Sequence, residues 1–135
     1  MVDISYLEIA EAIRKFSFPE IDLVVGIAEG GLVPAALAAY RTGVELRAIK
    51  INYRDENNTP RYEEPQLFSP VPSDLNGRTI LLVDDVSVTG KTLDRAKALL
   101  PGCKIITFAL KGKADLVLFK GIKDCVNWPW KPAAL

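Results

Sequence analysis

Two adjacent aspartates, Asp84 and Asp85, stand directly after the apolar run Ile80–Val83. Neighbouring carboxylates repel each other, and burying them at the end of a strand lowers stability unless a cation or hydroxyl groups lie beside them. Magnesium and the hydroxyl groups of a ribose are natural partners for such a pair. The alternative is that both acids are ordinary solvated residues at a strand end.

The turn Thr89–Thr92, with the sequence Thr-Gly-Lys-Thr, opens a segment with a helical pattern. Free backbone N–H groups and the helix dipole suit a phosphate at such a position, although Thr89 could simply cap the helix. A triphosphate-binding P-loop is excluded, because its first glycine would fall on Asp85. A receiver domain is excluded by length, since only residues 86–135 follow the pair. Acids beside a phosphate cradle therefore indicate a ligand that carries both a sugar and a phosphate.

The elements that position these residues follow from hydrophobic periodicity. Helices are predicted over 5–16, 32–43 and 91–100, and strands over 21–28, 44–53, 79–84 and 104–110. Strands that alternate with helices predict an α/β fold, a mainly parallel twisted sheet flanked by helices. Ligands of such sheets bind beyond the carboxyl ends of strands. Two turns stand at such ends, Glu29–Gly31 after the first strand and the Asp84–Thr92 stretch after the central one.

The segment 53–76 has no helix or strand period and carries four prolines and many charges. A loop of this length in a compact domain is either functional or a solvated excursion, so a lid and a plain surface loop both remain open. The whole sequence, residues 1–135, is predicted to form one domain that includes this segment and a short C-terminal tail at about 111–131.

Composition excludes several classes of function. The chain has 17 basic and 17 acidic residues, and zero net charge argues against nucleic acid as the main partner. It has no histidine, which excludes histidine zinc sites and Ser-His-Asp hydrolysis. The two cysteines, Cys103 and Cys125, cannot make a disulfide framework. No run approaches a membrane span and the first residues do not read as a signal peptide, so we expect a cytoplasmic protein.

Three segments resemble the type I phosphoribosyltransferases. The run Ile80–Thr92 (ILLVDDVSVTGKT) is similar to their signature for phosphoribosyl pyrophosphate (PRPP). Residues 24–39 (VVGIAEGGLVPAALAA) resemble the strand, pyrophosphate loop and helix of the xanthine-guanine and hypoxanthine branch. The segment 106–111 (ITFALK) and the later Pro-Trp pair resemble the base-binding end of that branch. The likeness extends from about Ile21 to Trp130.

The resemblance implies a type I phosphoribosyltransferase fold with a reduced hood, and a Mg2+-dependent enzyme. Such an enzyme transfers the phosphoribosyl group of PRPP to a purine or purine-like base and releases pyrophosphate. Relatives usually pair, so the implied partners are PRPP, a nucleobase and a second copy in a homodimer. The segment 53–76 would hold the flexible loop that closes over the site.

The implied site residues fall into four groups. The catalytic acids are Asp84 and Asp85, which would hold the ribose hydroxyls directly or through Mg2+. The 5′-phosphate would lie on Val88, Thr89, Gly90, Lys91 and Thr92. The pyrophosphate would lie on Glu29, Gly30 and Gly31, a loop that often has unusual peptide geometry in the family. The base would contact Lys111, Val126 and Trp128.

Four positions depart from the pattern of the branch. Val88 stands where purine enzymes usually carry an acid near the N7 proton of the base, and Glu29 stands where a basic residue is common. Cys125 occupies the position of an aromatic residue that stacks on the base, and Lys131 follows the Pro-Trp pair where an acid is usual. Trp128 could replace the missing aromatic residue or belong to the core.

The departures leave three functional hypotheses. The first is an active phosphoribosyltransferase for a purine or purine-like base. The second is a non-catalytic regulatory protein that binds PRPP or a nucleotide on the same fold. The third, a relic that binds nothing, is weakened by the presence of every acid and phosphate-loop residue.

Overall fold

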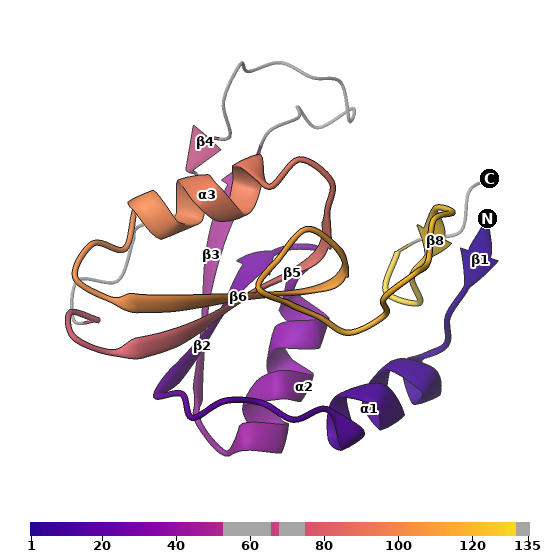
Figure 1. Ribbon diagram of the computed structural model, residues 1–135, viewed down its shortest axis with the longest axis horizontal. Coiled ribbons are helices and arrows are strands. Elements are labelled where there is room, and N and C mark those ends of the chain that lie inside the picture. The colour runs from indigo at the N-terminus through magenta and orange to yellow at the C-terminus, as the bar shows by residue number, and fades with distance from the viewer. Residues whose placement is uncertain (53–65, 68–74, 132–135) are drawn as a thin grey trace.

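The computed structural model describes residues 1–52, 66–67 and 75–131 (Figure 1). Most of the predicted loop at 53–76 therefore lies outside the described residues. In chain order the elements are β1 (Val2–Asp3), α1 (Tyr6–Lys15), β2 (Leu23–Ala28), α2 (Leu32–Thr42), β3 (Glu45–Asn52), β4 (Gln66–Leu67), β5 (Thr79–Ser87), α3 (Lys91–Ala98), β6 (Lys104–Gly112), β7 (Leu116–Val117) and β8 (Val126–Asn127).

The main sheet has the strand order β4-β3-β2-β5-β6-β7. Strands β3, β2, β5, β6 and β7 run parallel to one another, and β4 runs antiparallel to β3. The prediction of a mainly parallel α/β sheet flanked by helices is confirmed. β2 and β5 lie side by side in the middle, so their carboxyl ends bring the two predicted ligand turns to the same edge.

Helices cover both faces of the sheet. Ile9 and Ile13 of α1 and Ala35 of α2 pack on one face, and Leu93 and Ala96 of α3 pack on the other. The central run Ile80–Val83 is completely buried, as expected for a parallel strand covered on both sides. Within the described ranges, none of the helices is both long and apolar enough to cross a membrane.

The predicted helix boundaries are close to the observed ones. At the start of α1 the Ser5 and Glu8 side chains form a reciprocal capping box, as their spacing predicts. Helix α2 ends at Thr42, and its C-cap residue, Gly43, takes the left-handed conformation. Helix α3 stops at Ala98, two residues earlier than expected, and Gly90 rather than Thr89 is its N-cap residue.

The predicted end of the central strand is wrong by three residues. β5 does not stop at Asp84 but continues to Ser87, because Val86 pairs with Lys111 and Ser87 with Gly112 of β6. The two acids therefore lie within the hydrogen-bonded ladder rather than beyond it.

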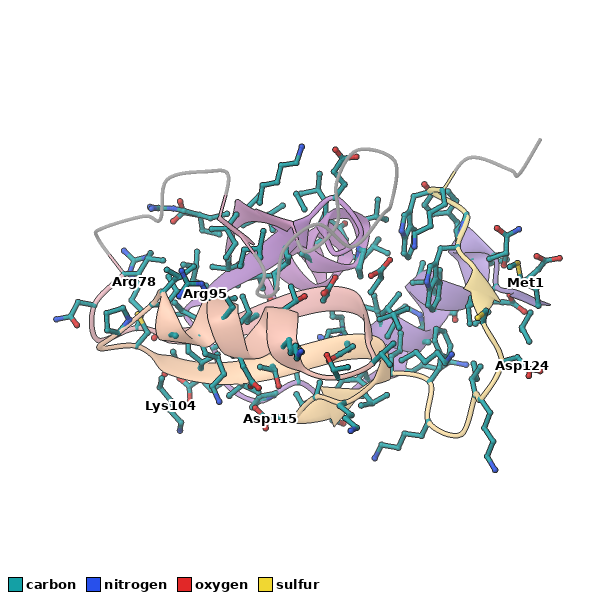
Figure 2. The ribbon with its side chains drawn as sticks, turned by 90° about the horizontal axis from the view of Figure 1, so that it is seen from above. Met1, Arg78, Arg95, Lys104, Asp115 and Asp124 are labelled. Carbon is teal, nitrogen blue, oxygen red and sulfur yellow. The ribbon has the colours of Figure 1, made fainter. Side chains whose placement is uncertain are left out.

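A second, two-stranded sheet joins the first and last described segments. β1 pairs in parallel with β8, with Val2 opposite Val126, and Val2 N donates to Cys125 O at 2.9 Å. We call β1, β8 and the turn 128–131 the hood. Figure 2 shows Met1 and Asp124 at one end of the molecule, while Arg78 and Lys104 lie at the other.

Candidate active site

The acid pair is largely enclosed within β5. Asp85 is 7% exposed, and Asp84 is partly buried. The Asp85 N–H donates to Asp84 Oδ1 at 2.9 Å, and the Val86 N–H donates to Asp85 Oδ1 at 2.7 Å. The remaining oxygen, Asp85 Oδ2, is buried and accepts no hydrogen bond from the described residues. It lies 3.5 Å from Lys131 Nζ, at ion-pair range without hydrogen-bond geometry.

The Asp84 carboxyl is held in surroundings that favour its protonated form. Burial and the adjacent charge of Asp85 raise the pKa of the Asp84 carboxyl well above its usual range, while Lys131 lowers it by a smaller amount. Asp84 therefore keeps its proton more readily than an exposed aspartate does. A ligand that brings positive charge or hydroxyl donors to the pair would favour the ionised form of Asp84.

The loop Glu29–Gly31 lies directly against the acid pair. A Cβ atom on Gly30 would stand 2.6 Å from Asp85 Oδ2, and one on Gly31 would stand 2.4 Å from Val83 O and 2.9 Å from Asp84 Cα. Only glycine permits this approach. The structure thus brings the predicted pyrophosphate loop and the predicted catalytic acids together.

Glu29 points toward β3 rather than toward the acids. Its Oε1 lies 3.4 Å from Lys50 Nζ, and both side chains are substantially exposed. The Ala28–Glu29 peptide bond is cis, a geometry of the unusual kind expected for this loop. The acidic side chain that stands where a basic residue is common in the branch is thus paired with a cation.

The predicted phosphate loop leads from β5 into α3. Gly90 has a φ of +86°, which favours glycine. It is the N-cap residue of α3 and, having no side chain, leaves the helix N-terminus without a hydrogen bond from an N-cap side chain. Thr89 Oγ1 accepts a hydrogen bond from Lys91 N at 3.3 Å. Val88 is 74% exposed. The first turn of α3 therefore begins a few residues beyond the acids, where a bound phosphate would meet backbone N–H groups.

The predicted base-binding residues lie on the hood side of the sheet. Lys111 Nζ donates to the Asp124 carbonyl at 2.7 Å, so it fastens the tail in this structure. Val126 belongs to β8 and pairs with Val2. Their roles toward a base stay predictions.

Trp128 occupies a core position. It is 1% exposed and stacks on Trp130, with ring centroids 5.5 Å apart and planes 2° apart. Its centroid lies 6.5 Å from that of Phe119. Trp128 therefore presents no open face to a base in this structure, and the core interpretation describes it better than the base-stacking one.

Two residues near the acids were absent from the predicted site. Lys131 was noted only as a departure from a pattern, yet its ammonium reaches Asp85. Ser87 has a buried hydroxyl without a partner among the described residues, at the end of β5. Ser87 could have been suggested by its place inside the motif. The position of Lys131 depends on a contact with residues far away in the sequence and has no local signal.

The described residues offer limited protein ligands for a metal. They contain no group of three or more His, Cys, Asp or Glu side chains that could hold an ion. They do contain a buried carboxylate oxygen without a hydrogen bond, Asp85 Oδ2, beside a second carboxylate. One or two carboxylates completed by substrate oxygens and water are the usual surroundings of Mg2+, so the pair fits that ion.

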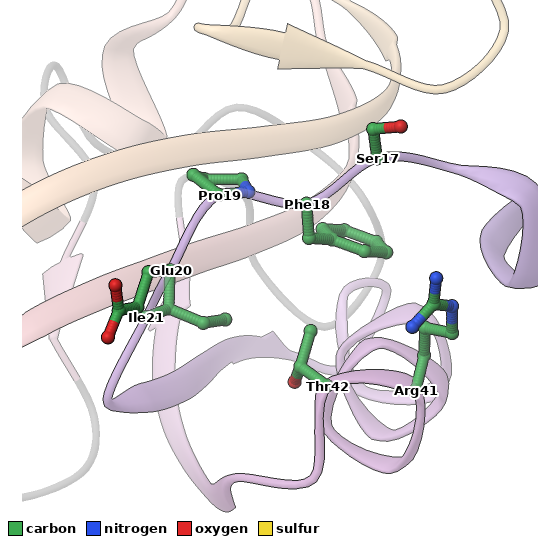
Figure 3. A pocket seen from close by; sticks show the side chains of 7 residues that line it. All are labelled: Ser17, Phe18, Pro19, Glu20, Ile21, Arg41 and Thr42. Atoms are coloured by element: carbon green, nitrogen blue, oxygen red, sulfur yellow. The ribbon is translucent and has the colours of Figure 1, made fainter.

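A cavity of about 570 Å³ lies elsewhere and takes no part in this arrangement (Figure 3). Its lining residues precede β2 or end α2, at the amino edge of the sheet, opposite the edge that carries the acids. They are Ser17, Phe18, Pro19, Glu20, Ile21, Arg41 and Thr42. The Arg41 Nε group donates to Arg14 O at 2.9 Å.

Comparisons with known proteins agree with the geometry. The structure of a purine phosphoribosyltransferase from Pyrococcus horikoshii is similar with a TM-score of 0.77 and 25% identity, covering 99% of this chain and 96% of that one. A xanthine-guanine phosphoribosyltransferase from Idiomarina loihiensis is 23% identical over 94% of this chain and 84% of its own length.

Two further relatives match over shorter stretches. An orotate phosphoribosyltransferase from Sulfurisphaera tokodaii is 34% identical over 86 residues, 64% of this chain and 40% of that protein. A transcriptional regulator from Methanocella arvoryzae is 32% identical over 75 residues, 55% of this chain and 36% of the regulator. This chain thus spans well under half the length of either protein.

The family assignment rests on nearly the whole chain. The profile of the phosphoribosyl transferase domain matches residues 3–133, which include the glycine loop, the acid pair and the phosphate loop. The chain belongs to the phosphoribosyltransferase family.

Proposed function

We propose that this protein transfers the phosphoribosyl group of PRPP to a purine or purine-like base and releases pyrophosphate. One observation carries the proposal: an acid pair enclosed in β5 contacts a glycine loop and is followed by the N-terminus of α3, whose N-cap residue, Gly90, supplies no side-chain cap. A ligand that carries a pyrophosphate, a ribose and a 5′-phosphate would meet all three features at once.

The acids would act on the ribose. When the bond to pyrophosphate breaks, positive charge develops on the ribose ring. Asp84 and Asp85, fixed by backbone hydrogen bonds in a water-poor position, would offset that charge without reorganising. In the ground state the same oxygens would accept hydrogen bonds from the ribose hydroxyls, which would orient the ring above the glycine loop.

Mg2+ is the proposed cofactor, with Asp84 and Asp85 as its protein ligands. When bound, the ion would neutralise charge on the departing pyrophosphate. Gly30 and Gly31 let the loop pack against Asp85 and the β5 backbone, because a Cβ on either residue would collide there. A pyrophosphate held on this loop would therefore lie beside the acids. Val88 is exposed, but its side chain is not an acid. It therefore cannot handle a ring proton as the acid of a purine enzyme would at this position.

The test is release of pyrophosphate from PRPP in the presence of Mg2+ and a panel of bases, including 6-oxopurines, adenine and orotate. Turnover with a purine is the expected result. Binding of PRPP without turnover on any base would refute the enzymatic proposal. Turnover with orotate alone would move the substrate class away from purines.

A non-catalytic regulator that binds PRPP or a nucleotide is the second candidate. Val88, which cannot transfer a proton, favours it, as does the similarity to a transcriptional regulator. Calorimetry that shows tight binding of a nucleotide, together with no turnover on the base panel, would support this alternative. A cytoplasmic location and a homodimeric state stay predictions.

A further inference from the structure

Lys131 brings a positive charge into the acid pair from the last described segment of the chain. Its Nζ lies 3.5 Å from Asp85 Oδ2, the buried oxygen that accepts no hydrogen bond from the described residues. The Lys131 side chain remains 53% exposed. The ammonium group is therefore held at the acids but is still able to reach a ligand in the site.

The backbone of Lys131 is fixed by the hood. Its N–H donates to Trp128 O at 3.1 Å, which closes the turn 128–131. Trp128 is buried and stacks in parallel on Trp130, and the Trp130 ring meets Tyr6 of α1 edge-on with centroids 6.1 Å apart. The contacts of Trp130 with Trp128 and Tyr6 thus fix the residue directly before Lys131.

The same carboxylate oxygen also faces the glycine loop. A Cβ on Gly30 would stand 2.6 Å from Asp85 Oδ2, so Gly30 and the Lys131 ammonium both lie against this one atom. The loop Glu29–Gly31 contains no Lys or Arg of its own. A pyrophosphate placed on the loop would bring several negative charges next to a carboxylate, and a cation there would offset the repulsion.

We infer that Lys131 is the pyrophosphate-binding cation of this site, moving from Asp85 in the free protein to the pyrophosphate of bound PRPP. The inference rests on the proposed function and adds a residue to it. A lysine suits the role, because its flexible stem carries three donors that can serve the acid and the ligand in turn. The transfer also frees Asp85 for the ribose hydroxyls and Mg2+.

Calorimetry with three probes tests the inference: PRPP, inorganic pyrophosphate and ribose 5-phosphate, each with Mg2+. Lys131→Met should weaken PRPP and pyrophosphate by at least about tenfold, the value of one charge-assisted hydrogen bond. Ribose 5-phosphate, which lacks the pyrophosphate, should bind at least as tightly as it does to the wild type, because without a pyrophosphate Lys131 gains no contact with the ligand and stays on Asp85. Lys131→Arg keeps the charge and should restore most of the lost affinity.

Lys123→Met is the matched control, since it removes the same charge from an exposed position in the same tail. It should change none of the three affinities. Equal weakening of ribose 5-phosphate by Lys131→Met, unchanged PRPP binding by that variant, or no binding of PRPP and pyrophosphate by the wild type would each overturn the inference. If no base in the panel gives turnover but Lys131→Met still binds PRPP and pyrophosphate more weakly than the wild type, the proposed reaction is refuted and the role of Lys131 is supported.

Discussion

At the scale of single residues, the acid pair combines a destabilising arrangement with a binding arrangement. Two carboxylates share a buried strand, and only one of their four oxygens faces a cation at ion-pair distance in the described residues. Such a placement is unfavourable in the free protein and becomes favourable when a ligand supplies hydroxyl groups and positive charge. Function explains a choice of residues that folding alone disfavours.

Asp85→Asn should reduce turnover by about 10²-fold, because it removes one fixed charge that stabilises the transition state. Steady-state kinetics with PRPP and the best base from the panel measure the effect. Asp124→Asn, an exposed aspartate on the tail, is the control and should keep wild-type turnover. Unchanged turnover in Asp85→Asn would exclude this residue from the mechanism.

Asp84→Asn should stabilise the protein at neutral pH in the absence of ligand and Mg2+. Because the pKa of Asp84 is raised on folding, the folded state binds the proton more tightly than the unfolded chain does. The free energy of unfolding of the wild type therefore falls as the pH rises from the usual aspartate range through the raised pKa of Asp84. Asparagine does not ionise, so the free energy of unfolding of Asp84→Asn does not fall in this way as the pH rises.

Urea denaturation at about pH 4 and pH 8 measures the difference between Asp84→Asn and the wild type. We expect a gain on the order of 1 kcal/mol at the higher pH and a smaller gain at the lower pH. A variant that is less stable than the wild type at both values would show that ionised Asp84 helps to hold the free structure together.

The residue scale also shows what the sequence could and could not predict. Adjacent acids and a Thr-Gly-Lys-Thr turn are local patterns, and the structure brings both to one edge of the sheet. The ion pair between Lys131 and Asp85 joins residues that are 46 positions apart in the numbering. No local pattern marks such a contact, because tertiary packing alone determines it.

At the scale of elements, the contact between the β2–α2 turn and β5 is what assembles the site. Gly30→Ala should displace the Asp85 carboxylate, since the added methyl group would stand 2.6 Å from Oδ2. We expect PRPP affinity to fall at least about tenfold, with a loss of stability smaller than that of a core substitution. Calorimetry and chemical denaturation measure the two effects.

Gly26→Ala provides the comparison. Its Cβ would stand 2.6 Å from Ala35 Cβ of α2 and 3.2 Å from Gly31 O, and none of its three nearest atoms belongs to the acids. It should lower the free energy of unfolding by about 1–3 kcal/mol through overpacking. If Gly30→Ala instead lost stability like Gly26→Ala and kept its PRPP affinity, the turn would be a packing feature and not a ligand loop.

The type of each long element followed from its pattern, whereas short elements and strand ends did not. β5 extends past Asp84 because β6 continues to pair with it, and a carboxylate in the sequence gives no sign of that pairing. β1 and β8 contain two residues each, too few for any period to appear. These strands form because the tertiary fold brings the two segments side by side.

At the scale of the whole molecule, the hood depends on Trp128. Trp128→Ala should lower the free energy of unfolding by about 3–5 kcal/mol, the usual cost of removing a buried aromatic side chain. Trp130→Ala is the control and should cost less, because Trp130 is only partly buried. A loss of base affinity with unchanged stability in Trp128→Ala would instead support the original base-stacking interpretation.

The pairing of β1 with β8 has a consequence for the order of assembly. Val2 and Val126 are partners, so β1 cannot pair until synthesis has reached β8. The sheet and its acid pair close over much shorter sequence separations and can form earlier. Lys131 follows β8 in the chain, so the site acquires its neutralising charge only when synthesis has passed β8.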